Sequence, residues 1–291
     1  MVVPETPPGR PRALTIDGLR LNVLEHGGDD RHGARRPLLL LHGGMAHARW
    51  WDLVAPALAA HCRPFALDRR GHGDSDWTAP ERYGWERDLL DVEQAMRALS
   101  PDPWTVLGHS QGGLLAVHLA TRGNVALERV VLLDVPLDPT SPRLVRAGRA
   151  LNRIPQIRYE TLEHAVRRFQ PYPAPHRVPD DVRLYLARHS FKPTPDGGWT
   201  SKFHWKMYRR ERRGPSPLTD FGERLRRVPV PTLSVRGEHS SILSRDEHAE
   251  MVARLERGVG VEIAGATHSL HAEQPDAVAR SIAQFLAHDG R

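Results

Sequence analysis

Short apolar runs and amphipathic segments alternate along most of the chain. The apolar runs have the length of buried strands and lie at residues 37–44, 63–68, 104–110, 128–136, 231–237 and 260–265. Segments with apolar residues at helical spacing stand between or after them, at 49–60, 85–99, 111–122, 244–256 and 275–289. Residues 13–25 add two strands around an Asp17-Gly18 turn. This alternation predicts an α/β fold, with a mostly parallel sheet of eight strands and helices on both faces.

The alternation stops between residues 139 and 227. This segment is rich in proline and arginine, and it holds ten of the eighteen aromatic residues but no apolar strand of the buried type. Helical spacing appears at 144–154, 159–170 and 180–191. Because the segment stands between two strands of the predicted sheet, we expect a helical cap (lid) over the strand carboxyl ends, where open parallel sheets bind ligands. Residues 1–138 and 228–291 would form the α/β core domain.

The formal net charge of +6 is concentrated in the same segment. Residues 139–227 contain 20 Lys or Arg against 8 Asp or Glu, whereas the rest of the chain contains 21 against 27. A stretch such as YRRERR (208–213) is found in nucleic-acid-binding proteins, but a solvated arginine face on an inserted cap explains it better. We therefore expect no nucleic-acid partner. Attraction of an anionic substrate is an alternative use of this charge.

Nothing in the chain is typical of a secreted or membrane-spanning protein. The Pro-rich start, residues 1–18, lacks the apolar centre of a signal peptide, and no run of eighteen apolar residues occurs. Cys62 is the single cysteine, so no intrachain disulfide can form, and its position fits a small buried side chain at a strand start. We expect a cytoplasmic protein without a membrane partner.

One hexapeptide carries the strongest chemical signal. Gly108-His109-Ser110-Gln111-Gly112-Gly113 matches G-x-S-x-G and lies between a predicted strand and a predicted helix. A serine at the tip of such a turn needs a strained backbone, and the flanking glycines remove Cβ clashes. The helix that follows directs its first N–H groups toward developing negative charge. The pattern predicts Ser110 as a nucleophile, the alternative being a glycine-rich helix start without chemistry.

Together with that motif, three further blocks resemble the α/β-hydrolase superfamily. They are LLLLHGGMAHARWW (38–51), ALDRRGHGDSD (66–76) and GATHSLHAEQPDAVARSIAQFL (265–286). All four occur in the family's order and cover nearly the whole chain outside 139–227. The resemblance implies the fold of that family, and for the block at 66–76 it implies a structural turn without a catalytic role.

The resemblance also implies roles for three histidines. A histidine follows the last strand in the family, so His268 would be the general base that takes the proton of Ser110. His42 and His109 match positions that support the site by packing and hydrogen bonding. For His271 we expect a surface or core-edge position.

An oxyanion hole needs two backbone N–H groups directed at the substrate oxygen. By resemblance, Gln111 supplies one of them, because it follows the nucleophile. Gly44 is expected to supply the other, with Met45 as its alternative. The two glycines of that loop, Gly43 and Gly44, would also permit its turn.

The acid of a catalytic triad is not obvious. Most relatives carry it in the loop after the strand at 231–237, near 240 or 241, where this chain has serines. Glu238 lies in that loop, but so close to the strand end that we expect it to point away from His268. Other relatives carry the acid after the strand that follows the nucleophile helix, which is Asp134 here. Asp134 closes an apolar run and would need a partner, so we favour it; Glu238 and a degraded triad are the alternatives.

No metal and no cofactor is expected. The histidine spacings lack a third ligand, and the glycine patterns of nucleotide-binding loops are absent. Nine aromatic residues of the cap predict a pocket for a small-molecule substrate with an apolar body; they are Tyr159, Phe169, Tyr172, Tyr185, Phe191, Trp199, Phe203, Trp205 and Tyr208.

These residues favour a serine hydrolase that cleaves an ester, thioester or lactone through an acyl-enzyme on Ser110. One alternative is a carbon–carbon bond hydrolase of the same fold. Another, of a different class, is a small-molecule receptor without catalysis, which the complete set of glycines with Ser110 and His268 disfavours. Ser110 also argues against epoxide hydrolases and haloalkane dehalogenases, which resemble this chain but use an aspartate at that position.

Overall fold

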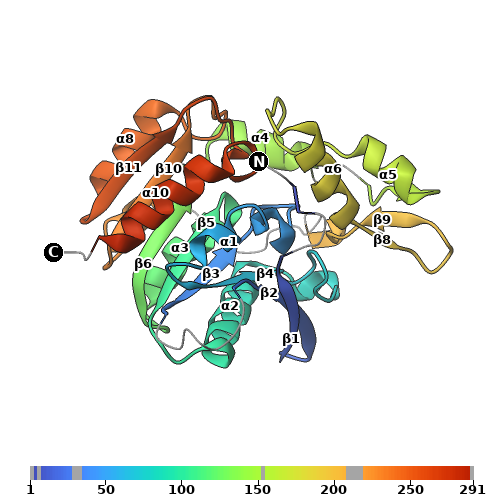
Figure 1. The fold of residues 1–291 in the computed structure, drawn as a ribbon, viewed down its shortest axis with the longest axis horizontal. Coiled ribbons are helices and arrows are strands. Elements are labelled where there is room, and N and C mark those ends of the chain that lie inside the picture. The colour runs from blue at the N-terminus through green and yellow to red at the C-terminus, as the bar shows by residue number, and fades with distance from the viewer. Residues whose placement is uncertain (1–2, 5–7, 28–34, 152–154, 208–218, 289–291) are drawn as a thin grey trace.

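The computed structural model describes residues 3–4, 8–27, 35–151, 155–207 and 219–288. Its centre is a sheet of eight strands in the order β1-β2-β4-β3-β5-β6-β10-β11 (Figure 1). β1 pairs antiparallel with β2, and β2 with β4, whereas all the other pairs are parallel. The predicted α/β class and the eight-stranded, mostly parallel sheet are confirmed. The strands are β1 (Arg10–Ile16), β2 (Leu19–Glu25), β3 (Pro37–Leu41), β4 (Arg63–Leu67), β5 (Trp104–His109), β6 (Leu127–Leu133), β10 (Thr232–Gly237) and β11 (Gly258–Ile263).

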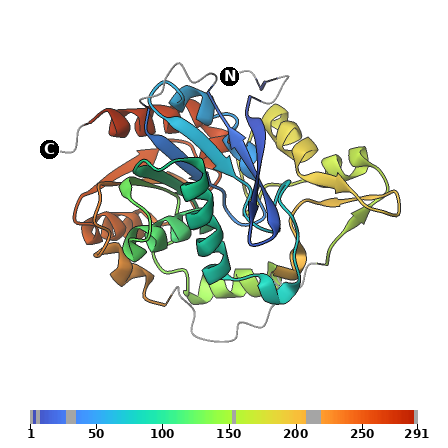
Figure 2. The ribbon, with the colours of Figure 1, turned by 90° about the horizontal axis from the view of Figure 1, so that it is seen from below.

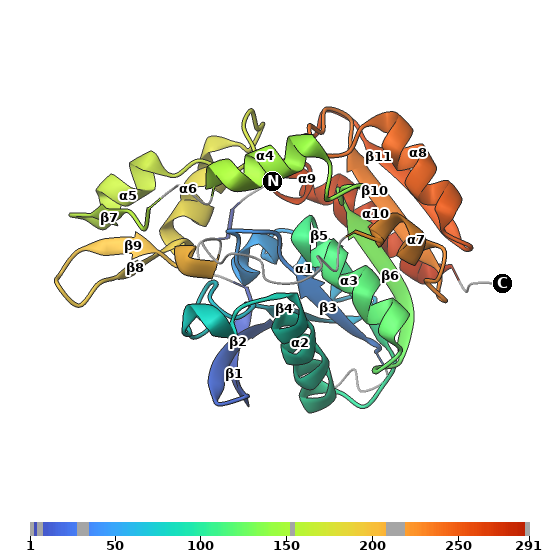
Figure 3. The same cartoon turned by 180° about the vertical axis from the view of Figure 1, so that it is seen from behind.

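Helices cover both faces of this sheet, α1 and α10 on one and α2, α3 and α8 on the other (Figures 1 and 3). The strand β3 shows why. Leu38 and Leu40 join the buried cluster on the α10 face, and Leu39 and Leu41 join the one on the α3 face. Successive strand residues point to opposite faces, so a strand covered on both sides is an unbroken apolar run. The helices are α1 (Ala55–Leu58), α2 (Trp85–Leu99), α3 (Gln111–Arg122), α8 (Arg245–Arg254), α9 (Leu270–Glu273) and α10 (Pro275–Ala287).

The prediction of one helix over 49–60 is wrong. The chain forms a 3₁₀ turn, η2 (Ala48–Trp51), and then the four-residue α1. Pro56 lies in the first turn of α1, where its missing N–H removes no helical hydrogen bond. The proline therefore begins a new short helix and does not sit inside a longer one.

Between β6 and β10 the chain leaves the sheet. It forms α4 (Pro142–Leu151), α5 (Leu162–Arg168) and α6 (Asp180–His189), and α4 lies above the carboxyl ends of β5 and β6 (Figure 3). A small antiparallel sheet of β7 (Arg158–Tyr159), β9 (Trp199–Ser201) and β8 (Phe191–Pro193) was not predicted. Its strands are two or three residues long, too short for an alternating pattern. Its β8–β9 hairpin projects away from the main sheet (Figures 1 and 2).

We propose 139–227 as the cap, and the last helix of this segment packs on the core domain. Helix α7 (Phe221–Leu225) contacts α3 and α8, and its buried Phe221 and Leu225 belong to the core cluster on that face. In the middle of this segment, α6 packs on η2, and the Tyr185 hydroxyl donates a hydrogen bond to Asp52. Among the described residues, no helix has both the length and the apolar character needed to cross a membrane.

Candidate active site

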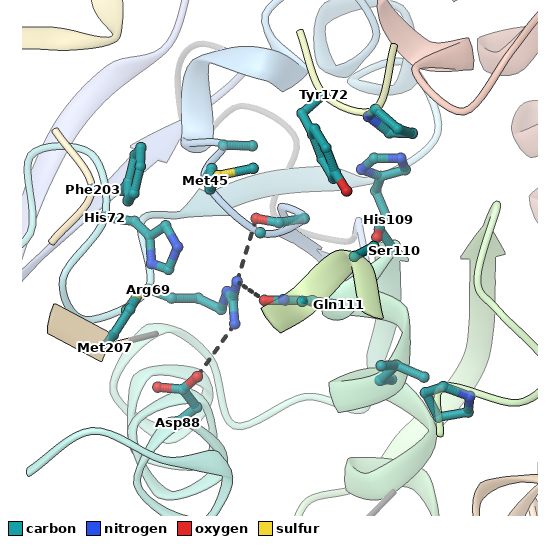
Figure 4. Close-up of a pocket in the computed structure, with 18 of the residues that line it drawn as sticks. Met45, Arg69, His72, Asp88, His109, Ser110, Gln111, Tyr172, Phe203 and Met207 are labelled. Carbon is teal, nitrogen blue, oxygen red and sulfur yellow. Dashed lines mark hydrogen bonds and ion pairs between the residues drawn. The ribbon is translucent and has the colours of Figure 1, made fainter. Parts of the chain in front are cut away.

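A cavity of about 1670 Å³ lies between the sheet and the cap. Its walls include the backbone loop at Gly43 and Gly44, the Ser110 turn and His268. Tyr172 and Phe203 of the 139–227 segment face the same space (Figure 4). The cavity thus lies at the carboxyl ends of the parallel strands, and residues from distant parts of the sequence meet in it.

Ser110 occupies the tight turn between β5 and α3. Its backbone has φ 51° and ψ −117°, and residues other than glycine seldom adopt a positive φ. Its N–H donates to the carbonyl of Leu133, 3.0 Å away. The flanking glycines are needed for space: a Cβ on Gly108 would lie 2.3 Å from the Gly112 backbone, and one on Gly112 would lie 2.1 Å from the Leu41 carbonyl oxygen. The geometry is that of the elbow that the G-x-S-x-G pattern predicted.

Asp134 lies directly after β6, has no exposed surface and faces His268. His268 Nδ1 is 2.6 Å from Asp134 Oδ2, a hydrogen-bond distance. The Ser240 hydroxyl donates to the same oxygen over 2.5 Å, and the backbone N–H of Gly237 donates to Oδ1 over 3.1 Å. A buried carboxylate with three donors is well solvated by the protein itself.

Glu238 is not brought to His268. Its carboxylate is 39% exposed and accepts a hydrogen bond from the N–H of Gly265 over 2.7 Å. That hydrogen bond is the main cause that lowers the pKa of Glu238, with the charge of His239 as the next. Ser240, in the same loop, turns its hydroxyl to Asp134. Sequence reasoning noted the two serines of this loop but gave neither of them a role.

The three residues considered for the oxyanion hole, Gly44, Met45 and Gln111, all line the cavity. Met45 has a positive φ of 62°, so the loop after Gly43 is strained at a residue other than glycine. The side chain of Arg69 lies beside this loop and Gln111 (Figure 4). Arg69 was missed because its block was interpreted as a structural turn, and no periodicity shows where a turn residue points.

His109 and His271 form a buried group beside His268. His109 Nε2 lies 2.9 Å from the carbonyl oxygen of His268, and its ring centroid is 4.4 Å from that of His271. His271 was expected at the surface or core edge, but it is 1% exposed and packs on Trp51. Burial, with the charge of His268, lowers the pKa of His271 to about 3. The uncharged ring therefore acts as an aromatic packing residue.

Of the nine cap aromatics named above, eight are described, and five of these line the cavity: Tyr159, Phe169, Tyr172, Phe191 and Phe203. Tyr185 is instead buried against Asp52. Tyr208 and the basic stretch 208–213 lie outside the described residues. Within the described chain, no group of three or more His, Cys, Asp or Glu side chains could hold a metal ion.

The model of the alpha/beta hydrolase family matches residues 38–281. This chain belongs to that family. The esterase YbfF of Escherichia coli is 25% identical over 272 residues, covering 92% of this chain and 99% of the relative. The pimeloyl-[acyl-carrier protein] methyl ester esterase of Nitrosospira multiformis is 25% identical over 263 residues, which are 85% and 93% of the two chains. A solved alpha/beta hydrolase of Novosphingobium aromaticivorans superposes with a TM-score of 0.78 at 27% identity, covering 97% and 100%.

Fold, family and relatives agree on the class of protein. The chain is an α/β-hydrolase enzyme.

Proposed function

We propose that this enzyme is a serine hydrolase that cleaves an ester, thioester or lactone, with Ser110, His268 and Asp134 as its triad. The observation that carries the proposal is the 2.6 Å contact of His268 Nδ1 with the buried Asp134, in the wall of the cavity that holds the strained Ser110. The contact supports a fixed tautomer, with Nδ1–H on the carboxylate and the Nε2 lone pair free for Ser110.

The proposed reaction has two halves. Ser110 Oγ attacks the carbonyl carbon while His268 Nε2 accepts its proton, and Asp134 stabilises the imidazolium. The N–H groups of Gly44 and Gln111 hold the oxyanion of the tetrahedral intermediate. His268 then protonates the leaving alcohol or thiol, which leaves an acyl group on Ser110. Water attacks that acyl group while His268 accepts one of its protons. The tetrahedral intermediate then collapses, the C–O bond to Ser110 breaks, and His268 returns the proton to Ser110 Oγ as the acid leaves.

The substrate is proposed to have an apolar body, because aromatic side chains of the cap surround the cavity. Arg149 and Arg168 also line it, both are exposed, and neither forms an ion pair with another described residue. They favour a substrate with an anionic group far from the scissile bond. With a matched pair of esters, neutral and carboxylate-bearing, we expect the lower KM for the anionic ester, and this advantage should shrink as salt is added.

Labelling by a fluorophosphonate, read by mass spectrometry, tests the nucleophile. We expect one adduct, on Ser110, and none in Ser110→Ala, which should also lose turnover of activated esters. Labelling that persists in Ser110→Ala would show that another residue reacts. A dienoic diketone substrate offered in parallel separates the carbon–carbon hydrolase: turnover of that compound without ester turnover contradicts the proposal.

A further inference from the structure

Arg69 joins two separate walls of the cavity through one side chain. It lies two residues after β4, is 3% exposed, and ends between the loop at Gly43 and the start of α3 (Figure 4). Its Nη2 donates to the carbonyl oxygen of Gly43 over 3.3 Å and to Oε1 of Gln111 over 3.4 Å. These two segments carry the N–H groups proposed for the oxyanion hole.

The contact at Gly43 has a direct consequence for Gly44. The carbonyl of Gly43 and the N–H of Gly44 belong to one planar peptide unit and point in opposite directions. A donor that fixes the carbonyl therefore fixes the direction of the N–H, and the hydrogen bond also polarises it. Arg69 therefore binds the carbonyl side of the peptide unit whose N–H side would meet the substrate oxygen.

His42 strengthens the same peptide unit. Its Nδ1 lies 2.7 Å from the Gly43 carbonyl oxygen, and its Nε2 accepts the backbone N–H of Arg69 over 3.1 Å. Burial and the charge of Arg69 lower the pKa of His42, so the ring is neutral and can donate at one nitrogen while accepting at the other. Both the backbone and the side chain of Arg69 are thus parts of one network behind Gly44.

The charge of Arg69 has a partner of its own. Nη1 donates to Asp88 Oδ2 of α2 over 3.2 Å, and the two side chains are 3% and 14% exposed. An arginine whose charge is already balanced by a carboxylate attracts a substrate anion weakly. The contacts favour a role in holding the site over a role in binding an anionic substrate.

We propose that Arg69 is a positioning residue that orients the two oxyanion donors, Gly44 through the Gly43 carbonyl and Gln111 through its side chain. The proposal rests on the function proposed above. Oxyanion donors act mainly in the transition state, so their misalignment lowers kcat and leaves KM nearly unchanged.

The test compares Arg69→Met, Arg69→Lys and a control, Arg87→Met, on a short activated ester. Arg87 lines the same cavity but is 52% exposed and lies 3.8 Å from Asp17, away from the oxyanion segments. For Arg69→Met we expect kcat to fall about tenfold or more, less than the ~10²–10³-fold of a deleted donor, with KM within about twofold. The Ki of a trifluoromethyl ketone, which forms a tetrahedral adduct, should rise by the factor by which kcat/KM falls.

Lysine keeps the charge but not the fork that reaches several acceptors, so Arg69→Lys should stay impaired. Full activity in Arg69→Lys, or a rise in KM at constant kcat, overturns the proposal. If neither Arg69 variant folds, Gln111→Leu decides, since it removes one acceptor from a partly exposed position. An unchanged kcat and Ki in that variant also overturns it. Ser110→Ala separates the two proposals: if it stays active the proposed function fails, whereas an inactive Ser110→Ala beside a fully active Arg69→Met contradicts only the positioning role.

Discussion

At the scale of single residues, Asp134 is surrounded by donors that only a carboxylate can use together. His268, Ser240 and the Gly237 N–H all direct hydrogens at its two oxygens. In Asp134→Asn the side-chain amide cannot accept at both ends, so the tautomer and orientation of His268 are lost. We expect kcat to fall by about 10⁴-fold, the size of this effect in serine hydrolases with a triad.

Glu238→Gln is the matched comparison for Asp134→Asn. Glu238 is the other candidate acid, and it accepts a hydrogen bond from the Gly265 N–H. We expect this variant to keep kcat within about twofold, because a change on an exposed side chain away from the reacting atoms has little effect. The steady-state rates of both variants show which carboxylate serves as the acid of the triad. A full rate in Asp134→Asn with a large loss in Glu238→Gln reverses the assignment.

The sequence pointed to Asp134 by an absence, since no aspartate follows the strand at 231–237. It could not show that Ser240 would donate to Asp134, because those residues are 106 positions apart. Arg69 escaped notice for a related reason: its partners Gly43 and Gln111 lie 26 and 42 positions away. A role that consists of contacts between distant residues leaves no pattern in either local segment.

At the scale of elements, the turn between β5 and α3 depends on the absence of side chains. A Cβ on Gly112 would lie 2.1 Å from the carbonyl oxygen of Leu41, so either α3 or β3 would have to shift. We expect Gly112→Ala to lower the free energy of unfolding by about 2 kcal/mol or more, in the range of overpacked cores, and to abolish ester turnover. Urea unfolding and a rate measurement check both effects.

Gly148 in α4 is the control for this change, because nothing lies within 4 Å of a Cβ built there. Alanine has the higher helix propensity by about 1 kcal/mol, so Gly148→Ala should be neutral or slightly stabilising. Equal stability of the two variants would show that the space around Gly112 is not limiting.

Elements with a long, regular pattern were predicted well, and short ones were not. The helix at 85–99 and the strand–helix unit around Ser110 have many residues that agree on one period. The segment 49–60 contains Pro56, and a proline can either end or start a helix. In the folded protein Pro56 lies in the first turn of α1. The strands β7, β8 and β9 are held by pairing with one another, which no local preference reveals.

At the scale of the whole molecule, buried neutral histidines should make the fold sensitive to acid. Burial is the main cause that lowers the pKa of His26, His189 and His204 to about 4, and of His271 to about 3. The unfolded chain binds these protons near pH 6.5, so it holds more protons than the folded chain between pH 6.5 and 4. Stability from these groups is present above pH 6.5 and is lost as the pH falls toward 4.

Buried aspartates act in the opposite direction. Burial raises the pKa of Asp68 and Asp88 to about 6, so their contribution to stability falls as the pH rises from 4 to 6. Among the described residues, nine histidines have a lowered pKa and four aspartates a raised pKa, which leaves a net loss of stability on acidification. We expect the urea midpoint to decrease from pH 7 to pH 5. In His271→Phe, the slope of the free energy of unfolding against pH should decrease by up to about 1.4 kcal/mol per pH unit below pH 6.5. A midpoint that rises on acidification contradicts this balance.

The sequence by itself determined the fold class and the succession of strands and helices along the chain, and it predicted Ser110 and His268 as site residues. Apolar periodicity and glycine placement are local properties, and both follow directly from the chemistry of neighbouring residues. Only the tertiary structure decided which carboxylate meets His268, what Ser240 binds and where Arg69 ends. Each of these depends on the meeting of two strand ends or loops that the chain brings together only after it has folded, since the His268–Asp134 pair alone spans 134 positions.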